Sequence, residues 1–351
     1  MTADRSRQAR AVEACPASRP DNAPQMVLFL LVPDFSMISF TACLEPLRVA
    51  NRMAERRLYA WRTASIDGAP VRASNGVPVM PDIAVGDAGR PGMAVVCAGL
   101  NADRFRDGTV LSWLRQTARA GVTMGGICTG ALILARAGLL SGRRCTIHWE
   151  NMEGFAEEFP EQDITATMFE VDRDRFTCSG GTAPLDMMVH LIGRDHGEAL
   201  AMQVAEQMLH TPVRHAGDPQ RSGLQYRTGI SHPKLLAAIA AMEARLEAPL
   251  GMDDLAAQVG LSPRQLERLF RQHLNRPPRR YYLELRLKRA RHLLLQTPMP
   301  VIQVAVACGF TSASHFAQAY HALFGCAPTE ERRREERRRE EPRREERRRE
   351  A

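Results

Sequence analysis

The sequence predicts an α/β domain with a doubly wound parallel sheet, followed by an all-α domain with two helix-turn-helix units. Its 351 residues are enough for two cores, since a single domain takes about 100–200 residues. Short apolar runs of β type alternate with helical patterns up to residue 210, which is typical of a parallel sheet covered by helices on both faces. From residue 231 onward the pattern is entirely helical and contains an internal repeat.

The first domain is expected to span residues 25–210, after a polar and aperiodic segment, residues 1–24, that we expect to be disordered. Short apolar runs predict its strands, and helical periodicity predicts the helices between them. The expected strands are Met26–Val32, Tyr59–Ile66, Met93–Leu100, Gly121–Gly126 and Cys145–Trp149, with helices at Thr41–Ala54, Val110–Ala120 and Thr129–Gly138.

A hairpin and two helices are expected to complete this domain. Ile164–Cys178 predicts a hairpin around Asp172–Asp174, and the helices follow at Ala183–His196 and Glu198–His210. Residues 211–230 are rich in Arg, Gly, Pro and Asp and have weak periodicity, so we interpret them as an interdomain linker.

The helical domain, residues 231–330, contains a repeat of about 50 residues. Asp254–Ser262 (DLAAQVGLS) matches Gln303–Thr311 (QVAVACGFT), and the match continues after one inserted residue. Each copy has the parts of a helix-turn-helix, which are a short helix, a glycine turn and a second helix with an exposed N-terminal half. One such copy also occurs in ordinary helical bundles, whereas two copies with a connecting helix favour DNA binding.

In the first copy, Gly260 makes the turn and Ser262 caps a helix with Pro263 at its first position. Its apolar residues are expected to face inward, which leaves side chains suited to guanine, adenine and phosphate on the outward face. The expected DNA contacts of this copy are Ser262, Arg264, Gln265, Arg268 and Arg271.

In the second copy, Gly309 makes the turn, and Phe316, Tyr320 and Phe324 anchor the second helix. The outward residues are less basic than in the first copy, so we expect more contact with base edges and less attraction to phosphate. The expected DNA contacts of this copy are Ser312, Ser314, His315 and Gln318.

A connecting helix is expected between the two copies, at Arg280–Leu295. At 1.5 Å per residue it is about 24 Å long. Recognition helices roughly 34 Å apart would meet successive major grooves on one face of a duplex. One chain is thus expected to bind DNA as a dimer of single units does.

The segment from about Ser231 to Glu330 resembles the DNA-binding domain of the AraC/XylS family. The residues that carry the resemblance are Gly309-Phe310, Phe316, Phe324-Gly325 and Pro328. The resemblance implies that the partners are double-stranded promoter DNA and RNA polymerase, most often with activation of transcription.

A cysteine in the first domain occupies a sharp turn between an expected strand and an expected helix. Cys128 lies in Gly125–Ala131 (GGICTGA), which is the arrangement that displays a nucleophile. Taken alone, this pattern is typical of a cysteine hydrolase. A small residue at a close-packed turn is the alternative interpretation.

The first domain resembles the PfpI-type, class I glutamine amidotransferase-like fold, and the domain order is similar to that of GlxA-type AraC regulators. The matching stretches are Leu28–Phe35, Leu44–Arg52, Gly126–Gly142, Thr146–Glu150 and Ser179–Ala183. Catalytic members have a histidine where this chain has Thr129, and an acidic residue where it has Ser39. A thiol without a base lacks activation, so we expect no catalytic residues, no enzyme activity and no cofactor.

A ligand pocket is still expected at the carboxyl ends of the strands of such a sheet. Aromatic rings there would hold a quaternary or guanidinium cation, Glu45 adds negative charge, and amide groups at Cys128 would receive a carboxylate. Alternatives are that Phe35 and Trp149 belong to the core and that His148 is structural. The expected lining is Phe35, Glu45, Cys128, Thr129, His148, Trp149 and Thr182.

Three segments look like the glycine-betaine and carnitine-responsive branch of this family, and an arginine-responsive branch stays open. They are Ser39-Phe40, Cys145–Asn151 and Thr177–Met188. The resulting hypothesis is a regulator controlled by a small amino-acid-like or quaternary-amine effector. Two alternatives are a cysteine-dependent hydrolase or amidotransferase fused to a DNA-binding domain, and a constitutive DNA-binding protein with an inert first domain. Pairing into a homodimer is left open.

Composition excludes several other classes of protein. The eight cysteines are scattered without a C-x-x-C pair, which argues against a metal site or a disulfide framework. We see neither an apolar run for a membrane span nor a signal peptide, so a cytoplasmic protein is expected. The net charge of +7 permits an anionic partner. Residues 331–351 form an Arg/Glu low-complexity tail that we expect to be solvated.

Overall fold

The computed structural model describes residues 23–221, 224–297, 299–334 and 337. It divides the chain into two compact units, Met1–Gln220 and Arg221–Ala351. The segment expected to be disordered, residues 1–24, lies almost entirely outside the described residues, as does most of the Arg/Glu tail. None of the described helices is long and apolar enough to cross a membrane.

A seven-stranded sheet in the order β5-β2-β1-β6-β7-β9-β8 forms the centre of the first unit. All its pairings are parallel except that of β8 with β9. Every residue of the central strand β6 is buried, as expected of a parallel sheet with both faces covered. The strands are β1 (Gln25–Leu31), β2 (Tyr59–Ser65), β5 (Ile83–Ala84), β6 (Met93–Cys97), β7 (Thr123–Ile127), β8 (Phe169–Asp172) and β9 (Arg175–Cys178), with a separate hairpin of β3 (Val71–Arg72) and β4 (Pro78–Val79).

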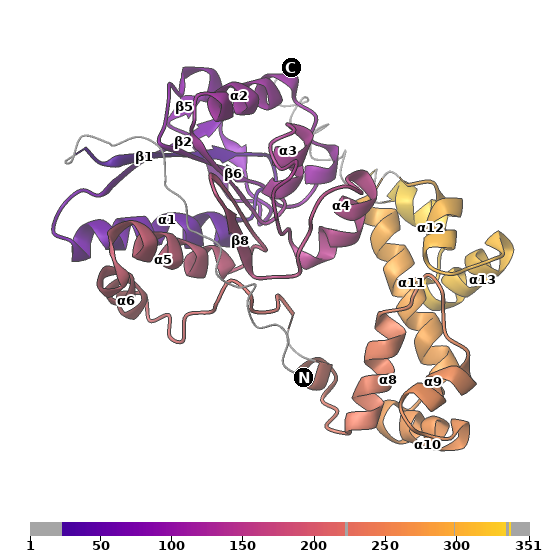
Figure 1. Cartoon of the computed structure of the whole chain (residues 1–351). Helices are drawn as coiled ribbons and strands as arrows, with labels where there is room; N and C mark the ends of the chain where they lie inside the picture. Colours follow the sequence, from indigo (N-terminus) through magenta and orange to yellow (C-terminus); the bar gives the residue numbers. More distant parts are fainter. Residues whose placement is uncertain (1–22, 222–223, 298, 335–336, 338–351) are drawn as a thin grey trace, which may run out of the picture. The chain divides into compact units, whose positions relative to one another are not determined.

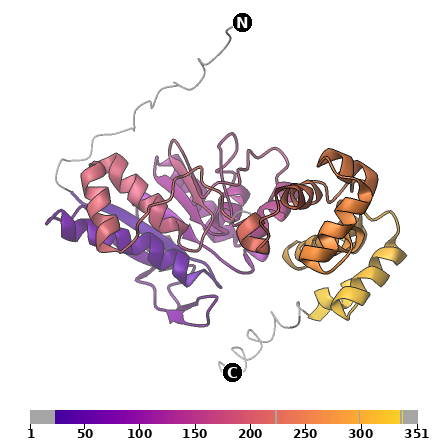
Figure 2. The ribbon, with the colours of Figure 1, turned by 90° about the horizontal axis from the view of Figure 1, so that it is seen from below.

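Helices cover both faces of this sheet, and the predicted fold class is confirmed (Figure 1). On one face lie α1 (Met37–Met53), α5 (Ala183–His196) and α6 (Glu198–Gln207), which pack side by side (Figure 2). On the other face lie α2 (Gly108–Arg119), α3 (Gly130–Arg136) and α4 (Met152–Glu158). Three short 3₁₀ turns, η1 (Val85–Asp87), η2 (Ala102–Arg104) and η3 (Trp149–Asn151), complete the described elements of the unit.

Helix α1 begins four residues before the expected start at Thr41, because Ser36 caps it by accepting a hydrogen bond from the Ser39 backbone N–H. The expected strand at Cys145–Trp149 is wrong. Cys145 forms only an isolated bridge with Ile164, because β9 occupies the place beside β7.

The expected linker, residues 211–230, is wrong in its first half. Thr211–Gln220 belongs to the first unit. Val213 and Ala216 pack against the core, and the Met168 N–H donates to the Ala216 carbonyl over 3.0 Å. These contacts are made to residues far away in the sequence, so local composition did not indicate them. A short helix, α7 (Leu224–Thr228), follows in the second unit.

The second unit consists of two helical lobes joined by one helix (Figure 1). The first lobe contains α8 (Pro233–Glu243), α9 (Met252–Gln258) and α10 (Pro263–Leu274). The second lobe contains α12 (Val301–Ala307) and α13 (Ala313–Phe324). The connecting helix α11 (Pro278–Gln296) has 19 residues and supplies Tyr282 to the first core and Leu287 to the second. It is therefore about 28 Å long, somewhat more than expected.

The domain also extends beyond residue 330, where the Arg/Glu tail was expected to begin. Residues 328–334 are helical. Glu331 is buried, where it accepts a hydrogen bond from the Tyr320 hydroxyl and pairs with Arg291 over 2.6 Å. Glu331, the first acidic residue of the tail, is thus part of the second lobe.

Candidate functional site

The first helix-turn-helix is α9, a turn at Gly260, and α10. Gly260 has φ +63°, and the Lys234 ammonium donates to its carbonyl over 2.7 Å. Ser262 and Gln265 form a capping box, in which each side chain accepts a hydrogen bond from the backbone N–H of the other residue. The sequence indicated the cap at Ser262 but not the capping role of Gln265. In the structure, the Ser262 hydroxyl and the Gln265 amide oxygen already accept hydrogen bonds from the backbone of the helix.

The outward face of α10 carries three exposed arginines, Arg264, Arg268 and Arg271. On the opposite face, Leu266 and Phe270 are buried in the first lobe. Arg271 pairs with Glu267 one turn earlier over 2.9 Å. The arginines, together with Glu267 and Gln272, surround a hollow in the surface. An exposed, basic recognition helix of this kind suits a phosphate backbone and the guanine edge.

The second helix-turn-helix is α12, a turn at Gly309, and α13. Gly309 has φ +74°, and Ser312 caps α13 by accepting a hydrogen bond from the His315 N–H over 3.3 Å. The one inserted residue of the repeat therefore lies in the turn, between the glycine and the cap. Ser312, Ser314, His315 and Gln318 are exposed, as are the five residues expected to bind DNA in the first copy. Helix α13 contains no Lys or Arg, so its outward face has no fixed positive charge.

Gly309 is packed much more closely than Gly260. A Cβ atom on Gly309 would lie 2.6 Å from the carbonyl oxygen of Glu247 and 2.8 Å from that of Leu246, in the loop after α8. Arg286 of α11 donates to the carbonyls of Cys308 and Gly309 over 2.8 and 2.6 Å. The turn of the second helix-turn-helix is therefore held against the first lobe. This contact fixes helices α10 and α13 relative to each other.

Cys128 is the residue at the sharp turn between β7 and α3. Its φ of +58° is in the left-handed region that residues other than glycine rarely adopt. Burial raises the pKa of its thiol to about 12, and the Glu150 carboxylate adds to this, although the Thr129 backbone N–H acts in the opposite direction. The thiol is thus protonated at neutral pH, which is the unreactive form.

The surroundings of Cys128 come from segments far apart in the sequence. Gly180, with φ +95°, lies so close that a Cβ atom would be 3.1 Å from the Cys128 sulfur. Ser39, where catalytic relatives have an acid, donates from its hydroxyl to the Gly181 carbonyl over 3.4 Å. The His148 backbone N–H donates to the Cys128 carbonyl over 3.3 Å. The region around Cys128 is therefore tightly packed.

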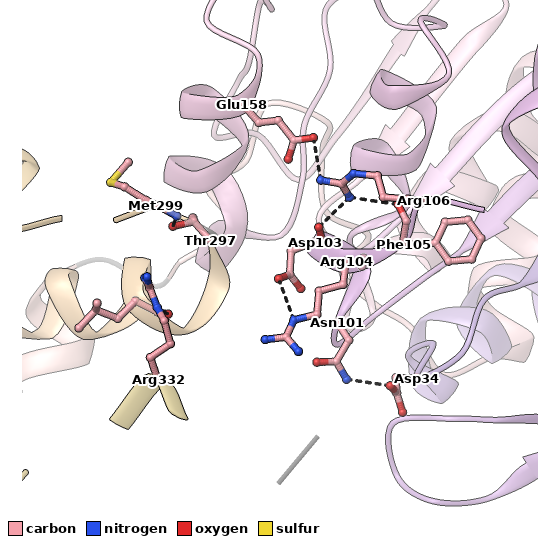
Figure 3. A network of polar contacts seen from close by, with 12 residues as sticks. Asp34, Asn101, Asp103, Arg104, Phe105, Arg106, Glu158, Thr297, Met299 and Arg332 are labelled. Atoms are coloured by element: carbon pink, nitrogen blue, oxygen red, sulfur yellow. Dashed lines mark hydrogen bonds and ion pairs between the residues drawn. The ribbon is translucent and has the colours of Figure 1, made fainter. Parts of the chain in front are cut away.

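Two of the expected pocket residues, Phe35 and Glu45, make contacts within the protein. The Phe35 ring is fully buried and packs edge-on against Phe40, with 5.8 Å between ring centroids. Its loop is braced by Asn101, which donates to Asp34 over 2.8 Å (Figure 3). Glu45 pairs with Arg48 over 2.7 Å. The structure thus leaves no exposed aromatic surface at Phe35 for a cation, in agreement with the alternative that assigned Phe35 to the core.

Other expected pocket residues stay near Cys128. The Thr129 hydroxyl is buried and donates to the Gly99 carbonyl over 2.6 Å. Trp149 is 39% exposed and lies beside His148, with 5.7 Å between ring centroids. His148 accepts a hydrogen bond from the Glu150 N–H through Nδ1. Trp149 is therefore the most exposed aromatic ring of this set.

One basic residue near this region was missed by sequence reasoning. Arg214 donates from Nη2 to the Thr182 hydroxyl over 2.7 Å and to the buried Asp186 carboxylate over 2.6 Å. No local pattern indicated it, because it lies in the segment expected to be a linker. No cluster of three or more metal-ligating side chains occurs in the part of the chain that the structure describes.

Comparison with known proteins identifies relatives for both units. The chain matches the DJ-1/PfpI family over residues 25–194 and a helix-turn-helix domain over residues 255–334. It is 45% identical to the HTH-type transcriptional regulator GbdR of Pseudomonas aeruginosa over 319 residues, covering 91% of this chain and 87% of GbdR. It is 38% identical to the HTH-type transcriptional regulator GlxA of Rhizobium meliloti, covering 91% of this chain and 98% of GlxA. The crystal structure of an AraC family transcriptional regulator from Pseudomonas putida, 30% identical, covers 53% of this chain and 100% of its own, with a TM-score of 0.49.

Proposed function

The chain belongs to the AraC-type helix-turn-helix transcription regulators that carry a DJ-1/PfpI domain, and from this premise we propose that a small metabolite bound in the DJ-1/PfpI domain controls its binding to promoter DNA. In this proposal the metabolite shifts the population of a DNA-competent state of the second unit. The effector is a small amino-acid-like or quaternary-amine compound, and the first domain is not catalytic.

One observation carries the DNA interface of this proposal. Helices α10 and α13 each bury one face in a lobe and expose the opposite face to solvent, and every residue expected to contact DNA is on an exposed position. In this proposal Arg264 and Arg268 read bases or phosphates, and Gln318 reads a base edge. Gel-shift titration on a fragment selected in vitro for wild-type binding tests this assignment. Unchanged affinity of the triple variant Arg264→Ala, Arg268→Ala, Gln318→Ala would reject it.

The effector proposal depends on the groups near Cys128. The partly exposed indole of Trp149 can hold a quaternary ammonium by cation–π attraction. The guanidinium of Arg214, whose side chain is 35% exposed, is a partner for a carboxylate. A zwitterion such as glycine betaine, carnitine or arginine has both groups. Isothermal titration of the full chain with these three compounds and with choline tests the class, and absence of heat from all four would remove it.

The neutral state of Cys128 supports a regulator and argues against thiol catalysis. Cys128→Ala is therefore expected to bind DNA as the wild type does. With a pKa well above that of an ordinary thiol, Cys128 is also expected to react slowly with iodoacetamide at pH 7–8, and faster only as the pH approaches 12. A thiol-dependent hydrolysis that Cys128→Ala abolishes would favour the enzyme instead.

RNA polymerase is the further partner that we propose, because the family resemblance implies activation at a promoter. Transcription in vitro from a bound promoter, with purified polymerase and with or without the chain, measures the sign of regulation. Self-association into a homodimer in the cytoplasm is part of the same proposal. Sedimentation of the full chain at several concentrations tests it.

A further inference from the structure

We propose that Thr211–Gln220, a segment we call the strap, couples the effector pocket to the second unit. This inference deepens the proposed function and rests on it. The strap is the last part of the first unit, and Arg221 begins the second. Its two ends are hydrogen-bonded to the two sides of the region around Cys128, so a change there is passed directly to the chain that leads into the DNA-binding unit.

One end of the strap is fixed at Arg214. This guanidinium donates twice to the Asp186 carboxylate, over 2.9 and 2.6 Å, and once to the Thr182 hydroxyl over 2.7 Å. Asp186 is fully buried, and the Arg214 backbone N–H and the His210 ring also contact it, each over 2.7 Å. Separating Arg214 from Asp186 would leave a buried charge unpaired, which is costly. Arg214 is therefore anchored to α5 through Asp186, and its contact to Thr182, the exposed N-cap residue of α5, is the one a ligand can change.

The other end of the strap is fixed at Gln220. Its side-chain Nε2, which has two N–H bonds to donate, lies within hydrogen-bond distance of three oxygens, the Thr146 hydroxyl and the carbonyls of Ile147 and Thr167, at 2.8, 2.9 and 2.9 Å. Thr146 and Ile147 immediately precede His148 and Trp149, the residues beside the expected pocket. One side chain thus joins the pocket wall to the last residue of the first unit.

Both connections start at Cys128. On one side, Gly180 packs against Cys128 and is followed by Gly181 and Thr182, which contacts Arg214. On the other side, the His148 N–H donates to the Cys128 carbonyl, and the preceding residues hold Gln220. A ligand that rests on Thr182 and Trp149 therefore acts on both ends of the strap at once. A contiguous set of contacts of this kind carries coupling when both sites bias the equilibrium of one two-state element.

The strap is held firmly enough between its ends to transmit this change. Val213 and Ala216 pack on the core of the first unit, and the Met168 N–H donates to the Ala216 carbonyl. Asp218 accepts a hydrogen bond from the His215 N–H over 2.8 Å, which closes a turn within the strap. The segment is therefore an ordered part of the domain, in contrast to a free linker.

Gln220→Glu tests this inference with little change in shape. It replaces the donor with a carboxylate that faces three oxygen acceptors, so the end of the strap should be released. Gln162→Glu is the matched control, because Gln162 also donates from Nε2 to a carbonyl, that of Arg143, but does not touch the strap. For both full-length variants, thermal melting checks folding, calorimetry measures binding of glycine betaine, carnitine and arginine, and gel shift measures DNA affinity with and without each compound.

We expect Gln220→Glu to bind the active compound as the wild type does, while the effect of that compound on DNA affinity falls by about tenfold, within the usual range of coupling. Gln162→Glu should keep the wild-type effect. If Gln220→Glu unfolds the first unit, Gln220→Ala gives the same comparison with a milder change.

The failure of this inference differs from the failure of the proposed function. If a compound binds the wild type and changes its DNA affinity, and Gln220→Glu or Gln220→Ala keeps the full change, the strap is not the coupling element. If no compound gives heat with the wild type, the effector class is wrong. In that case the strap is judged by DNA affinity without any compound, which should change in the Gln220 variants and stay constant in Gln162→Glu.

Discussion

The two helix-turn-helix units of this chain place a glycine with positive φ at the same point of the turn, but they surround it differently. Around Gly260 a Cβ atom would meet only the Lys234 ammonium, at 3.6 Å, whereas around Gly309 it would meet backbone oxygens within 2.8 Å. A lysine of the same lobe holds the first turn, and Arg286 of the connecting helix holds the second. The first turn thus makes contacts within its own lobe, while the second turn also packs the two lobes against each other.

The recognition helices differ in the same direction. Helix α10 exposes Arg264, Arg268 and Arg271, while α13 exposes serine, histidine and glutamine side chains. The first lobe therefore presents positive charge on its surface. The second lobe presents a neutral helix face, whose position is fixed by the packing of Gly309 on the first lobe. Two repeats with the same fold can thus have different roles, the first attracting the DNA and the second holding a neutral recognition helix in a fixed position. The following predictions test this division, from the largest expected effect to the smallest.

Gly309→Ala is expected to destabilise the second unit more than Gly260→Ala. Both substitutions put a Cβ atom at positive φ, which costs about 1–2 kcal/mol. At Gly309 the clash with the Leu246 and Glu247 carbonyls adds about 1–3 kcal/mol of overpacking. Urea unfolding of the full chain, monitored by circular dichroism, measures the free energy of unfolding that each variant loses. Equal losses in the free energy of unfolding would mean that the packing of Gly309 between the lobes does not contribute to stability.

Arg268→Ala and Gln318→Ala are expected to weaken DNA binding by about 1–3 kcal/mol if each side chain reads a base. They should differ in their dependence on salt. Removing the arginine should reduce the slope of log K against log salt by about 1 if it contacts phosphate, and removing the glutamine should leave it unchanged. Fluorescence anisotropy at several salt concentrations measures both. A reduced slope in Gln318→Ala would contradict the division of roles.

Arg286→Lys is expected to destabilise the second unit by about 1 kcal/mol, because a lysine cannot donate to two carbonyls in the fork geometry of a guanidinium. Arg286 also lies over the Phe310 ring, 4.2 Å from its centroid. Lys234→Arg, in the first lobe, keeps the positive charge at a turn where the side chain donates to one carbonyl, that of Gly260. It should therefore destabilise the second unit less. Thermal melting of the two variants compares them, and a larger loss at Lys234 would reverse the assignment.

Glu267→Gln is expected to strengthen DNA binding slightly. It releases Arg271 from an exposed i,i+4 ion pair, which is worth about 0.3–0.5 kcal/mol, and removes a negative charge from the basic face. The gain should disappear at high salt, since exposed charges are screened. Anisotropy at two salt concentrations measures the change. Weaker binding would indicate that the pair holds Arg271 in its DNA-binding position.

Much of the fold followed from local sequence patterns. Helix α5 has the predicted bounds, Ala183–His196, because a glycine follows it directly and apolar residues repeat along it. The turn glycines and the cap at Ser262 were equally visible. What sequence could not indicate are contacts between distant segments. The packing of Gly309 on Glu247 and the bonds of Gln220 to Thr146 exist only after folding.

The candidate sites show the same limit of local patterns. Outward residues on α10 and α13 follow from helical periodicity, so their exposure could be predicted. The pocket could not be predicted residue by residue, because its walls come from several strand ends. Phe35 was expected to line it and is buried, while Arg214 was assigned to a linker and lies beside Thr182.

The continuous helix α11 joins the lobe that carries the basic helix α10 to the lobe that carries the neutral helix α13, so in the proposed complex one chain has two unlike ends along DNA. In the proposed complex, a palindromic site for one chain would present the same sequence to both helices and could not satisfy both equally. The site of one chain in this proposed complex therefore has a direction along the promoter. Inverting that site without changing any of its base pairs would exchange the end that faces the transcription start, and with it the surface offered to the transcription machinery.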